Sequence, residues 1–578
     1  MASIFSTFNS ARSGLTTHQS AINVTSHNIA NASTIGFSRQ RAVITTTRPI
    51  SIGGESGQIG TGAQVSAIER VRDSFLDYQV RVETSELGKY SAKSEYLSQV
   101  EGIFNEPSDT GLSTMFGEFF DAFQELSKQS TSSSTRVVVA QKTQALCDTL
   151  NNTYTKLEDL QKNAQDSIKS NIKEINSILD QLTTLNDQIR IVSITGDQPN
   201  DLMDSRDALL DELSLKFGIE IDDKQFNGND VSWIGMSNDL NPIVNSAPNG
   251  EVTRFGYITN VEIDPATSEG TLTYYVNGDT SSESNKRTLT IGKITEAEAA
   301  EIKRSGIILT DGEGKALDSN GKTLDGSIKT YGGIGTRGGI MVFNPSKGEL
   351  AGDMEVQDSI QNYMNQLDNL AKGMALAVNA IHSGSLDSNL DSTLGVIDFF
   401  VNSEDNNNEA AISAKNITLN SEILKDPSKI NTKATNASGE GDGSRALAIA
   451  QLQTTLIAIN AVNGVNANGG LITRKDFLDG KLSADGLSII NDTASGTKIE
   501  SYYQDVIDKL GVEAQHAYRV VSNEEDLLTS LELNRLSVSG VSLDEEMTNL
   551  IQFQKAYSAN AKTITTVSEM LDVILGLI

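Results

Sequence analysis

The two ends of the chain carry the clearest hydrophobic pattern. In each, apolar residues recur at alternating spacings of four and three, which is typical of a helix that packs along another helix. The N-terminal seam runs through Ile4, Phe8, Ala11, Leu15, His18, Ile22, Thr25 and Ile29. The C-terminal seam runs through Leu543, Met547, Leu550, Gln554, Tyr557, Ala561, Ile564, Ser568, Leu571, Leu575 and Ile578. Four polar residues interrupt the seams: His18, Thr25, Gln554 and Ser568.

Neither terminal helix is expected to be stable alone. One apolar face of a single helix does not bury enough surface to offset the conformational entropy lost when about 30 residues become ordered. We therefore expect the two ends to pair with each other and with neighbouring copies of the chain. In the free monomer we expect them to be largely disordered.

Proline positions indicate where long helices run. The prolines lie at 49, 107, 199, 242, 248, 265, 345 and 427, which leaves 108–198 and 428–578 free of them. In the first of these stretches, one heptad frame runs through Leu146, Leu150, Leu157, Leu160 and Ala164. A second frame runs through Ile175, Ile178, Leu182, Leu185, Ile189 and Val192. The shift between them indicates a stutter in one helix. Further helical patterns cover 67–100, 201–216, 353–382, 445–460 and 497–537.

Two stretches lack a helical period. Residues 218–345 contain four of the prolines and short β-rich runs such as 271–276, which predicts an inserted β domain. Residues 383–442 are polar and form a second insertion. Residues 37–47 read as extended. The length suggests three to five domains.

The expected fold is mainly α with β insertions, in a multidomain chain with terminal coiled-coil helices. The expected division is an inner terminal-helix domain of 1–66 with 540–578, and a helical core of 67–217 with 346–382 and 443–539. The β-rich insertion at 218–345 and the second insertion at 383–442 lie outermost, because both chain ends must return to one place.

Charge and cysteine content narrow the functional classes. The formal charge is −30, and no cluster of Lys and Arg offers a surface for nucleic acid or anionic membrane. The single Cys147 excludes an intramolecular disulfide framework and a cysteine zinc cluster. We expect it to pack as a small apolar residue on a helix. The sequence has no secretory signal pattern and no apolar run of membrane-spanning length. Taken alone, these facts indicate a cytoplasmic protein.

Several patterns invite an enzymatic interpretation, and each has a plainer one. Residues 333–338 match GxGxxG, but the run at 339–343 that follows is extended where a dinucleotide site needs a helix. Gly321-Lys322-Thr323 lacks the earlier glycine of a phosphate loop, since Ala316 holds that position. The acidic run 311–326 would place Lys322 at a calcium-ligand position. Turns explain all three patterns better.

Histidines and helical carboxylates give no stronger signal. His18, His27, His382 and His516 have no metal-ligand spacing. Asp204, Asp207 and Asp211 lie at helical spacing near Arg206, which favours an exposed helix face over acid–base chemistry. We expect His18 and Thr25 to face a polar neighbour or a channel. We predict no enzyme activity, no cofactor and no metal.

Motifs at both ends resemble a known family. The N-terminal ones are SGL at 13–15, Gln19, Ala21, SHNIAN at 26–31 and TIGFSRQ at 34–40. They are similar to the signature of the axial proteins of the bacterial flagellum, which are the rod, hook and hook-associated proteins. The C-terminal LDEEM at 543–547, NLI at 549–551, QKAY at 554–557 and EML at 569–571, with 201–214 and AVNAIH at 377–382, resemble the hook-associated branch. Motif residues carried over from the family are Asn28, Asn31, Gly36, Asp544, Glu545 and Glu546.

The resemblance implies a secreted structural subunit at the hook–filament junction of the bacterial flagellum. It would be exported unfolded by the flagellar type III system and would self-assemble, as a ring or helical array of copies, through its terminal helices. The implied subunit interface is Ile4, Phe8, Leu15, Ile22, Ile29, Leu543, Met547, Leu550, Tyr557, Ile564, Leu571 and Leu575. The implied partners are further copies of the chain, the hook protein, a second hook-associated junction protein and a FlgN-like cytoplasmic export chaperone. The chaperone would grip Leu550, Phe553, Tyr557, Ile564 and Leu571.

Two alternatives remain open. One is a rod or hook protein of the same family. The other is an exported adhesin or hydrolase activity in the outer domains. No nucleic-acid partner and no membrane insertion are expected.

Overall fold

A computed structural model describes residues 2–51, 58–324, 339–386, 397–435, 437–466 and 469–576. The chain forms two compact units. The first comprises Met1–Lys89, Ile168–Ala351 and Val521–Ile578, and the second comprises Tyr90–Ser167 and Gly352–Val520. The fold is mainly α with β insertions, which confirms the predicted class. The four-part division derived from the sequence stays a prediction.

Helices account for most of the described chain. They are α1 (Ala2–Ala30), α2 (Ser74–Phe104), α3 (Leu112–Lys128), α4 (Ser133–Ile194), α5 (Asn200–Lys216), α6 (Glu296–Ser305), α7 (Glu349–Ser383), α8 (Ser421–Lys425), α9 (Ser444–Gln451), α10 (Arg474–Leu478), α11 (Ile499–Ser539) and α12 (Leu543–Leu575). The division between the two units falls within α2, α4, α7 and α11.

The strands are short by comparison. They are β1 (Gln40–Thr46), β2 (Ile50–Ser51), β3 (Gln58–Ile59), β4 (Ala63–Arg70), β5 (Ile219–Asp223), β6 (Asn229–Trp233), β7 (Thr253–Ile263), β8 (Glu269–Val276), β9 (Lys286–Lys293), β10 (Ile307–Asp311), β11 (Phe400–Asn402) and β12 (Ile417–Leu419). Each pairing among them is antiparallel.

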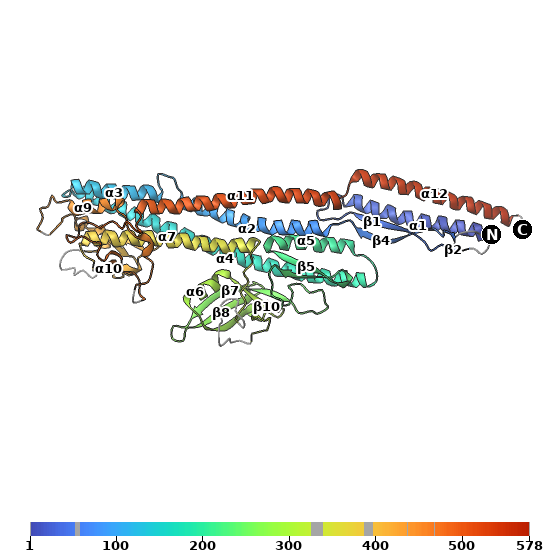
Figure 1. The fold of residues 1–578 in the computed structure, drawn as a ribbon, viewed down its shortest axis with the longest axis horizontal. Coiled ribbons are helices and arrows are strands. Elements are labelled where there is room, and N and C mark those ends of the chain that lie inside the picture. Colours follow the sequence, from blue (N-terminus) through green and yellow to red (C-terminus); the bar gives the residue numbers. More distant parts are fainter. Residues whose placement is uncertain are drawn as a thin grey trace. The chain divides into compact units, whose positions relative to one another are not determined.

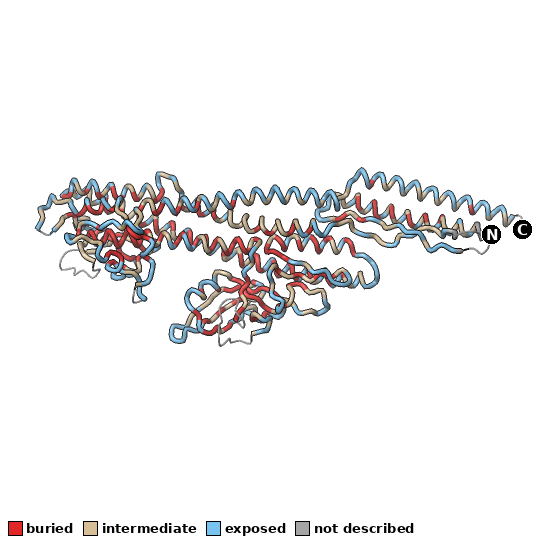
Figure 2. The backbone as a smooth tube through the Cα atoms, in the orientation of Figure 1, coloured by how far each residue is buried: buried red, intermediate tan, exposed pale blue. Residues whose placement is uncertain are grey.

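The terminal helices pair within the first unit, which confirms the expected pairing of the chain ends. Helix α12 runs beside α1 (Figure 1), and α1 also contacts β1 and β4. Strands β1 and β4 form a hairpin with Gln40 opposite Arg70, and the register shifts between Val43 and Ile44. Figure 2 shows that α12 exposes most of its residues. The expected disorder of these helices in the free monomer stays a prediction.

The predicted β insertion forms a sheet in the first unit. Its four strands have the order β10-β7-β8-β9, and α6 packs on β7. Ile258, Leu272 and Ile302 belong to its buried core. Helix α6 begins with a capping box between Thr295 and Glu298, which satisfies backbone N–H groups at its first turn.

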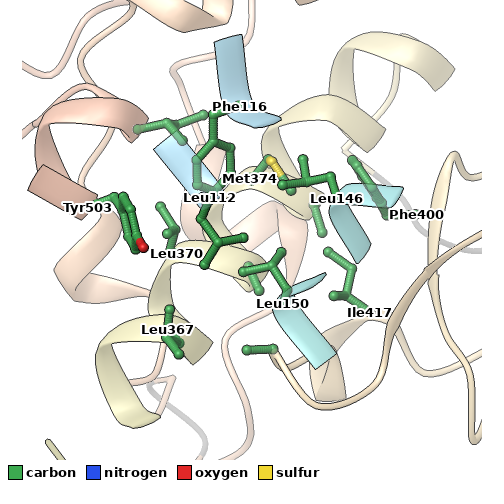
Figure 3. Close-up of a cluster of buried hydrophobic side chains, with 14 of the residues drawn as sticks. Leu112, Phe116, Leu146, Leu150, Leu367, Leu370, Met374, Phe400, Ile417 and Tyr503 are labelled. Carbon is green, nitrogen blue, oxygen red and sulfur yellow. The ribbon is translucent and has the colours of Figure 1, made fainter. Parts of the chain in front are cut away.

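The second unit contains a large apolar core. Its side chains come from α3, α4, α7, α11 and strands β11 and β12 (Figure 3). Phe116 and Tyr503 pack with ring centroids 6.0 Å apart. Cys147 is fully buried on α4 in this core, as predicted for a small apolar residue, and burial raises the pKa of its thiol.

Two predicted helix boundaries are wrong. Residues 67–70 belong to β4, and α2 begins only at Ser74, because the apolar residues before it pair across the hairpin. The pattern at 445–460 yields only α9, followed by short 3₁₀ turns at Leu452–Thr454 and Ile459–Ala461. The predicted stutter lies within α4, which is one helix of 62 residues.

Candidate functional site

The contact face of α1 consists mainly of small residues. Its buried positions are Ala11, Gly14, Thr17, Ala21, Val24, Thr25 and Asn28. Small side chains let neighbouring backbones approach closely. A Cβ added at Gly14 would lie 2.8 Å from Asn560 Nδ2 on α12. On the hairpin side, the Thr17 hydroxyl donates to the carbonyl of Ala63 over 2.9 Å.

The predicted N-terminal seam lies only partly in this contact face. Ala11 and Thr25 are buried, whereas the large apolar residues Ile4, Phe8, Leu15, Ile22 and Ile29 are half-buried. The expectation that His18 and Thr25 face a polar neighbour or a channel stays a prediction. Thr25 is 3 % exposed, and the His18 ring lies 6.1 Å from the Phe553 ring on α12.

On α12, the covered face is rotated relative to the predicted seam. The covered or half-covered positions are Glu546, Asn549, Leu550, Phe553, Ala556, Tyr557, Asn560, Ala561, Ile564, Val567, Leu571 and Ile574. This frame keeps Leu550, Tyr557, Ala561, Ile564 and Leu571 but replaces Gln554 by Phe553 and Ser568 by Val567. It leaves the polar Gln554 and Ser568 in solvent, which explains why those positions broke the seam.

The rotation exposes other predicted residues. Leu543 and Met547 are 52 % and 49 % exposed, and Ile551 on the same helix is 49 % exposed. Their spacing of four places them on one face of α12. The side chain of Leu575 and the whole of Ile578 lie outside the described residues.

Residues of the two terminal motifs meet in a cluster that we call the terminal clasp, formed by Asn28, Arg39, Gln40, Glu545 and Glu546. Arg39 Nε donates to Glu546 Oε1 over 2.8 Å. The two terminal nitrogens of Arg39 donate to the two oxygens of Glu545 over 3.0 and 2.9 Å. Asn28 Nδ2 donates to Glu546 Oε2 over 3.1 Å and to the Gln40 carbonyl over 2.8 Å. The clasp thereby joins α1, β1 and α12.

The terminal clasp contains a buried carboxylate that needs particular partners. Glu546 is 2 % exposed, so its carboxylate depends on Arg39 and Asn28 for compensation. Hydrogen bonding to Glu545 raises the pKa of Arg39 despite its partial burial. The Arg39 backbone N–H also donates to the Ser539 carbonyl over 2.8 Å, at the end of α11.

The other motif residues lie around the clasp. Asn31 Nδ2 donates to the His27 carbonyl over 3.0 Å at the end of α1. Gly36 adopts a φ of +79°, which favours glycine, in the loop that follows. Asp544 is exposed.

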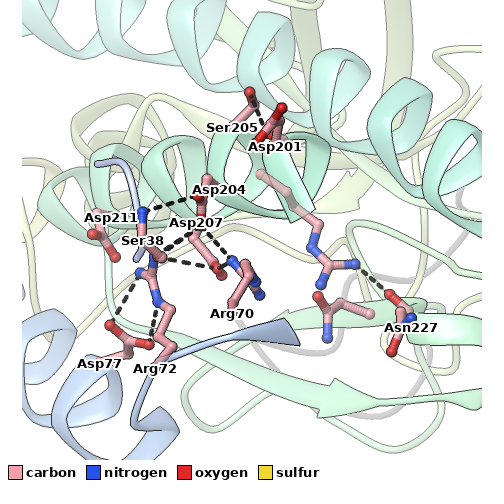
Figure 4. Close-up of polar contacts among 12 residues, drawn as sticks. Ser38, Arg70, Arg72, Asp77, Asp201, Asp204, Ser205, Asp207, Asp211 and Asn227 are labelled. Atoms are coloured by element: carbon pink, nitrogen blue, oxygen red, sulfur yellow. Dashed lines mark hydrogen bonds and ion pairs between the residues drawn. The ribbon is translucent and has the colours of Figure 1, made fainter. Parts of the chain in front are cut away.

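A second cluster, the Arg–Asp network, ties the base of the hairpin to α5 (Figure 4). Arg70 Nη1 lies 2.7 Å from both Asp204 and Asp207. Ser38 donates to Asp204 through its backbone N–H and its hydroxyl, over 2.9 and 2.7 Å. Arg72 pairs with Asp77 over 2.7 Å.

The same network reaches α2 and the end of α11. Arg81 Nε donates to Asp211 Oδ1 over 2.7 Å, and Arg535 Nη1 donates to Asp211 Oδ2 over 2.8 Å. Burial alone would raise the pKa of Asp207, but Arg72, Arg70 and Arg81 hold it below its ordinary value.

The interpretation of α5 as an exposed acidic face is therefore wrong. Asp204 and Asp207 are 7 % and 8 % exposed, and Arg206 is 4 % exposed. Their helical spacing was visible in the sequence. The arginines that pair with these aspartates lie more than 100 positions earlier, so the sequence did not bring them together.

The carboxylates of the terminal clasp and of the Arg–Asp network are engaged in ion pairs. Within the network, each aspartate lies at ion-pair distance from at least one guanidinium group. No group of His, Cys, Asp and Glu suited to a metal ion occurs within the described ranges. Asp318 Oδ1 accepts from the backbone N–H groups of Asn320 and Lys322, so its oxygen serves a turn. The GxGxxG pattern at 333–338 lies outside the described residues.

The histidines take separate places. His27 Nε2 lies 3.3 Å from Asp201 Oδ1, and the centroid of the His516 ring lies 6.1 Å from that of the Tyr90 ring, with the two rings tilted by 58°. His382 is buried at the end of α7. Along the part of the chain that the structure covers, none of the helices has the length and apolar character needed to cross a membrane.

Comparison with known proteins matches three stretches of the chain to family models. Residues 97–299 match the flagellar hook-associated protein FlgK helical domain. Residues 533–577 match the C-terminal model of the flagellar basal body rod FlgEFG proteins, and residues 8–37 match the flagella basal body rod protein model. The two terminal matches contain α12 and most of α1. The chain is therefore a flagellar structural protein.

Full-length relatives identify the branch. Flagellar hook-associated protein 1 of Bacillus subtilis is 30 % identical over 581 aligned residues, covering 100 % of this chain and 99 % of the relative. The Escherichia coli protein of the same name is 25 % identical and covers 99 % of this chain and 100 % of the relative. A solved FlgK structure from Burkholderia pseudomallei is 13 % identical with a TM-score of 0.49, covering 80 % of this chain and 100 % of that one. The chain belongs to the flagellar hook-associated protein 1 family.

Proposed function

We propose that this protein is the structural subunit that joins hook to filament, and that copies assemble through their terminal helices. The observation that carries the proposal is the exposed apolar face of Leu543, Met547 and Ile551 on α12. Single exposed apolar residues are common, but several on one helix face indicate a contact surface. Contacts between non-equivalent faces of identical subunits generate a ring or helical array.

The terminal clasp has a defined task in this proposal. It fixes the start of α12 against the end of α1, so the outer face of α12 is presented at one orientation. Leu550, Tyr557, Ile564 and Leu571 lie against α1 and hold the pair together, while Leu543 and Met547 contact the neighbouring copy. The half-buried Ile4, Phe8, Leu15, Ile22 and Ile29 border the contact face of α1 and extend the surface offered to neighbours.

We further propose that the chain is exported unfolded through the flagellar type III system with a FlgN-like chaperone on α12. The proposed chaperone residues Leu550, Phe553, Tyr557, Ile564 and Leu571 are those that α1 covers in the folded chain. The chaperone and α1 therefore compete for one face, and pairing of the chain ends follows release of the chaperone. This order keeps the exported chain unpaired until it reaches the growing structure.

The remaining partners follow from position. The hook protein would contact this subunit from one side, and a second hook-associated junction protein would contact it from the other. The proposed four-part division places the insertions at 218–345 and 383–442 on the outside of the array. The protein would act without catalysis, at the flagellum outside the cell.

Electron microscopy of cells that lack this protein tests the proposal, together with an assay of the medium for unpolymerised flagellin. We expect complete hooks without filaments, and flagellin lost to the medium. Missing hooks would assign the protein to the rod or hook instead. Intact flagella would contradict a role in the axial structure.

A further inference from the structure

A cavity beside the Arg–Asp network contains a buried cation without an acidic partner. The cavity has a volume of about 920 Å³ and lies within the first unit. Its walls come from the end of β4, the start of α2, helix α5 and the hairpin of β5 and β6. Figure 4 labels five of its lining residues, namely Arg70, Arg72, Asp77, Asp207 and Asn227.

Four of the five cations that line the cavity have carboxylate partners. Arg70, Arg72 and Arg81 pair with aspartates of the network, and Lys224 pairs with Asp222. The fifth is Arg206, which forms no ion pair with any carboxylate in the described part of the chain. Arg206 therefore differs from its neighbours in having no compensating charge of its own.

The contacts of Arg206 are to neutral oxygens. Its Nη1 donates to Asn186 Oδ1 over 3.1 Å and to the Asn227 carbonyl over 2.6 Å. Its Nε is buried without a hydrogen-bond partner among the described residues. The side chain is 4 % exposed, so water compensates little of the charge.

Arg206 nevertheless remains charged at neutral pH. Burial lowers its pKa to about 10, and the neighbouring Arg70 and Arg81 act in the same direction, whereas Asp207 and Asp223 oppose them. Asp207 is already engaged by Arg70 and Arg81, and Asp223 accepts from Asn229. A buried guanidinium that lacks a paired anion is costly to hold in the folded state.

We propose that this cavity binds a small oxyanion, a carboxylate or a phosphate group, with Arg206 as its principal ligand. The planar guanidinium matches such oxygens in geometry as well as charge. Lys224, which is exposed at the β5–β6 hairpin, supplies a second positive charge at the rim. Glu69 and Glu220 also line the cavity and are exposed, so the anion sits on the side of Arg206 and Lys224.

The oxyanion has two possible sources with the same chemistry. It is either a free ion from solution or the carboxylate of an acidic side chain on a second copy of the chain. The net charge of −30 provides acidic side chains in excess. In the second case the cavity would be an additional contact between copies, separate from the terminal helices.

Calorimetric titration of the full chain with inorganic phosphate tests the proposal, in chloride buffer of constant ionic strength. We expect one saturable site in the wild-type protein. Arg206→Met should weaken binding at least tenfold, and Lys224→Gln should weaken it severalfold. Arg48→Met removes an exposed arginine outside the cavity and should leave binding unchanged. Absence of saturable binding in the wild type, or equal binding by Arg206→Met and wild type, would overturn the proposal.

Two further measurements keep the test decisive. If Arg206→Met does not fold, the Lys224→Gln variant and the rise in the wild-type melting temperature with phosphate replace it. An unchanged melting temperature together with unchanged binding by Lys224→Gln would overturn the proposal. Sedimentation of the wild type then identifies the source. Dissociation of oligomers by phosphate assigns the carboxylate of a second copy, and unchanged sedimentation assigns a free anion.

Discussion

Arg39 and Glu546 lie 507 positions apart and form an ion pair of 2.8 Å in which the glutamate side chain is 3 % exposed. The arginine is in the loop after α1, and the glutamate is in the first turn of α12. Glu546 also accepts from Asn28 on α1, so one carboxylate links three segments. The contact between the chain ends is therefore specified by polar geometry as well as by apolar packing.

The first prediction concerns this pair. Glu546→Gln should destabilise the contact between α1 and α12 by about 1–3 kcal/mol, because it leaves Arg39 and Asn28 without their buried carboxylate. Glu545→Gln should cost no more than about 1 kcal/mol, since Glu545 is 56 % exposed. Hydrogen exchange of the amides around residues 28–40 and 543–550 measures the difference.

Asp544→Asn provides the matched control, because Asp544 is exposed in the same helical turn. It should leave the exchange of both segments unchanged. Equal effects of the changes at Asp544 and Glu546 would show that general charge at the start of α12, and not the clasp, holds the ends together.

The terminal helices could be predicted from the sequence, whereas their contact faces could not. The period of four and three depends on the residues of one segment alone, and it places α1 and α12 correctly. The face that is covered depends on the partner. On α12, packing against α1 determines that the frame of Phe553, and not that of Gln554, is covered. The frame that buries Phe553 and Val567 avoids burying two polar side chains.

The ion pairs of the Arg–Asp network likewise could not be predicted from the sequence. Asp204, Asp207 and Asp211 are typical of a solvated helix when α5 is considered alone. The structure buries Asp204 and Asp207 and half-buries Asp211, because arginines from segments distant in the sequence approach them. The sequence shows acidic residues on α5 and arginines at 70, 72 and 81, so ion pairs between the two groups could be suspected. A single sequence does not specify that these groups pair with each other.

The second prediction separates the two faces of α12. Leu543→Asp with Met547→Asp should leave folding within about 0.5 kcal/mol of the wild type, because both side chains are about half exposed. The same pair should abolish filament attachment, since the proposed contact between copies would bury charge. Thermal unfolding of the purified chain and microscopy of complemented cells provide the two measurements.

The double variant Leu550→Asp with Ile564→Asp changes the face of α12 that lies against α1. Both residues are half-buried against α1, so this pair should loosen the terminal helices while the core of the second unit stays folded. Gln552→Asp adds a charge at an exposed position of the same helix, and cells that carry this variant should swim normally. Filaments on cells carrying either double variant would contradict the terminal-helix interface.

The third prediction compares two glycines of α2. A Cβ at Gly88 would lie 2.5 Å from the Leu215 carbonyl oxygen and 3.2 Å from the Glu349 nitrogen, both backbone atoms. Gly88→Ala should therefore destabilise the first unit by about 1–3 kcal/mol. A Cβ at Gly102 meets nothing within 4 Å among the described residues, so Gly102→Ala should stabilise α2 by about 0.5–1 kcal/mol. Urea unfolding of the two variants measures both signs, and a stabilising Gly88→Ala would show that α5 and α7 do not approach α2 this closely.

The fourth prediction concerns His382, which is fully buried at the end of α7. The Asn431 backbone N–H donates to His382 Nε2 over 2.9 Å, so Nε2 accepts and carries no proton. His382 Nδ1 then donates to the Ile397 carbonyl over 3.0 Å. The imidazole is thus held in its neutral form, and protonation of Nε2 would break the bond to Asn431.

Burial lowers the pKa of His382 from 6.5 to about 4. Between these values the unfolded chain binds the proton and the folded chain does not, so stability falls as the pH drops from 6.5 towards 4. The difference in pKa corresponds to about 3 kcal/mol. His382→Gln should flatten this part of the pH profile, as measured by urea unfolding between pH 7 and pH 4. His516→Gln is the matched control and should retain the wild-type slope. Equal flattening of the slope by both variants would show that it does not arise from the buried His382.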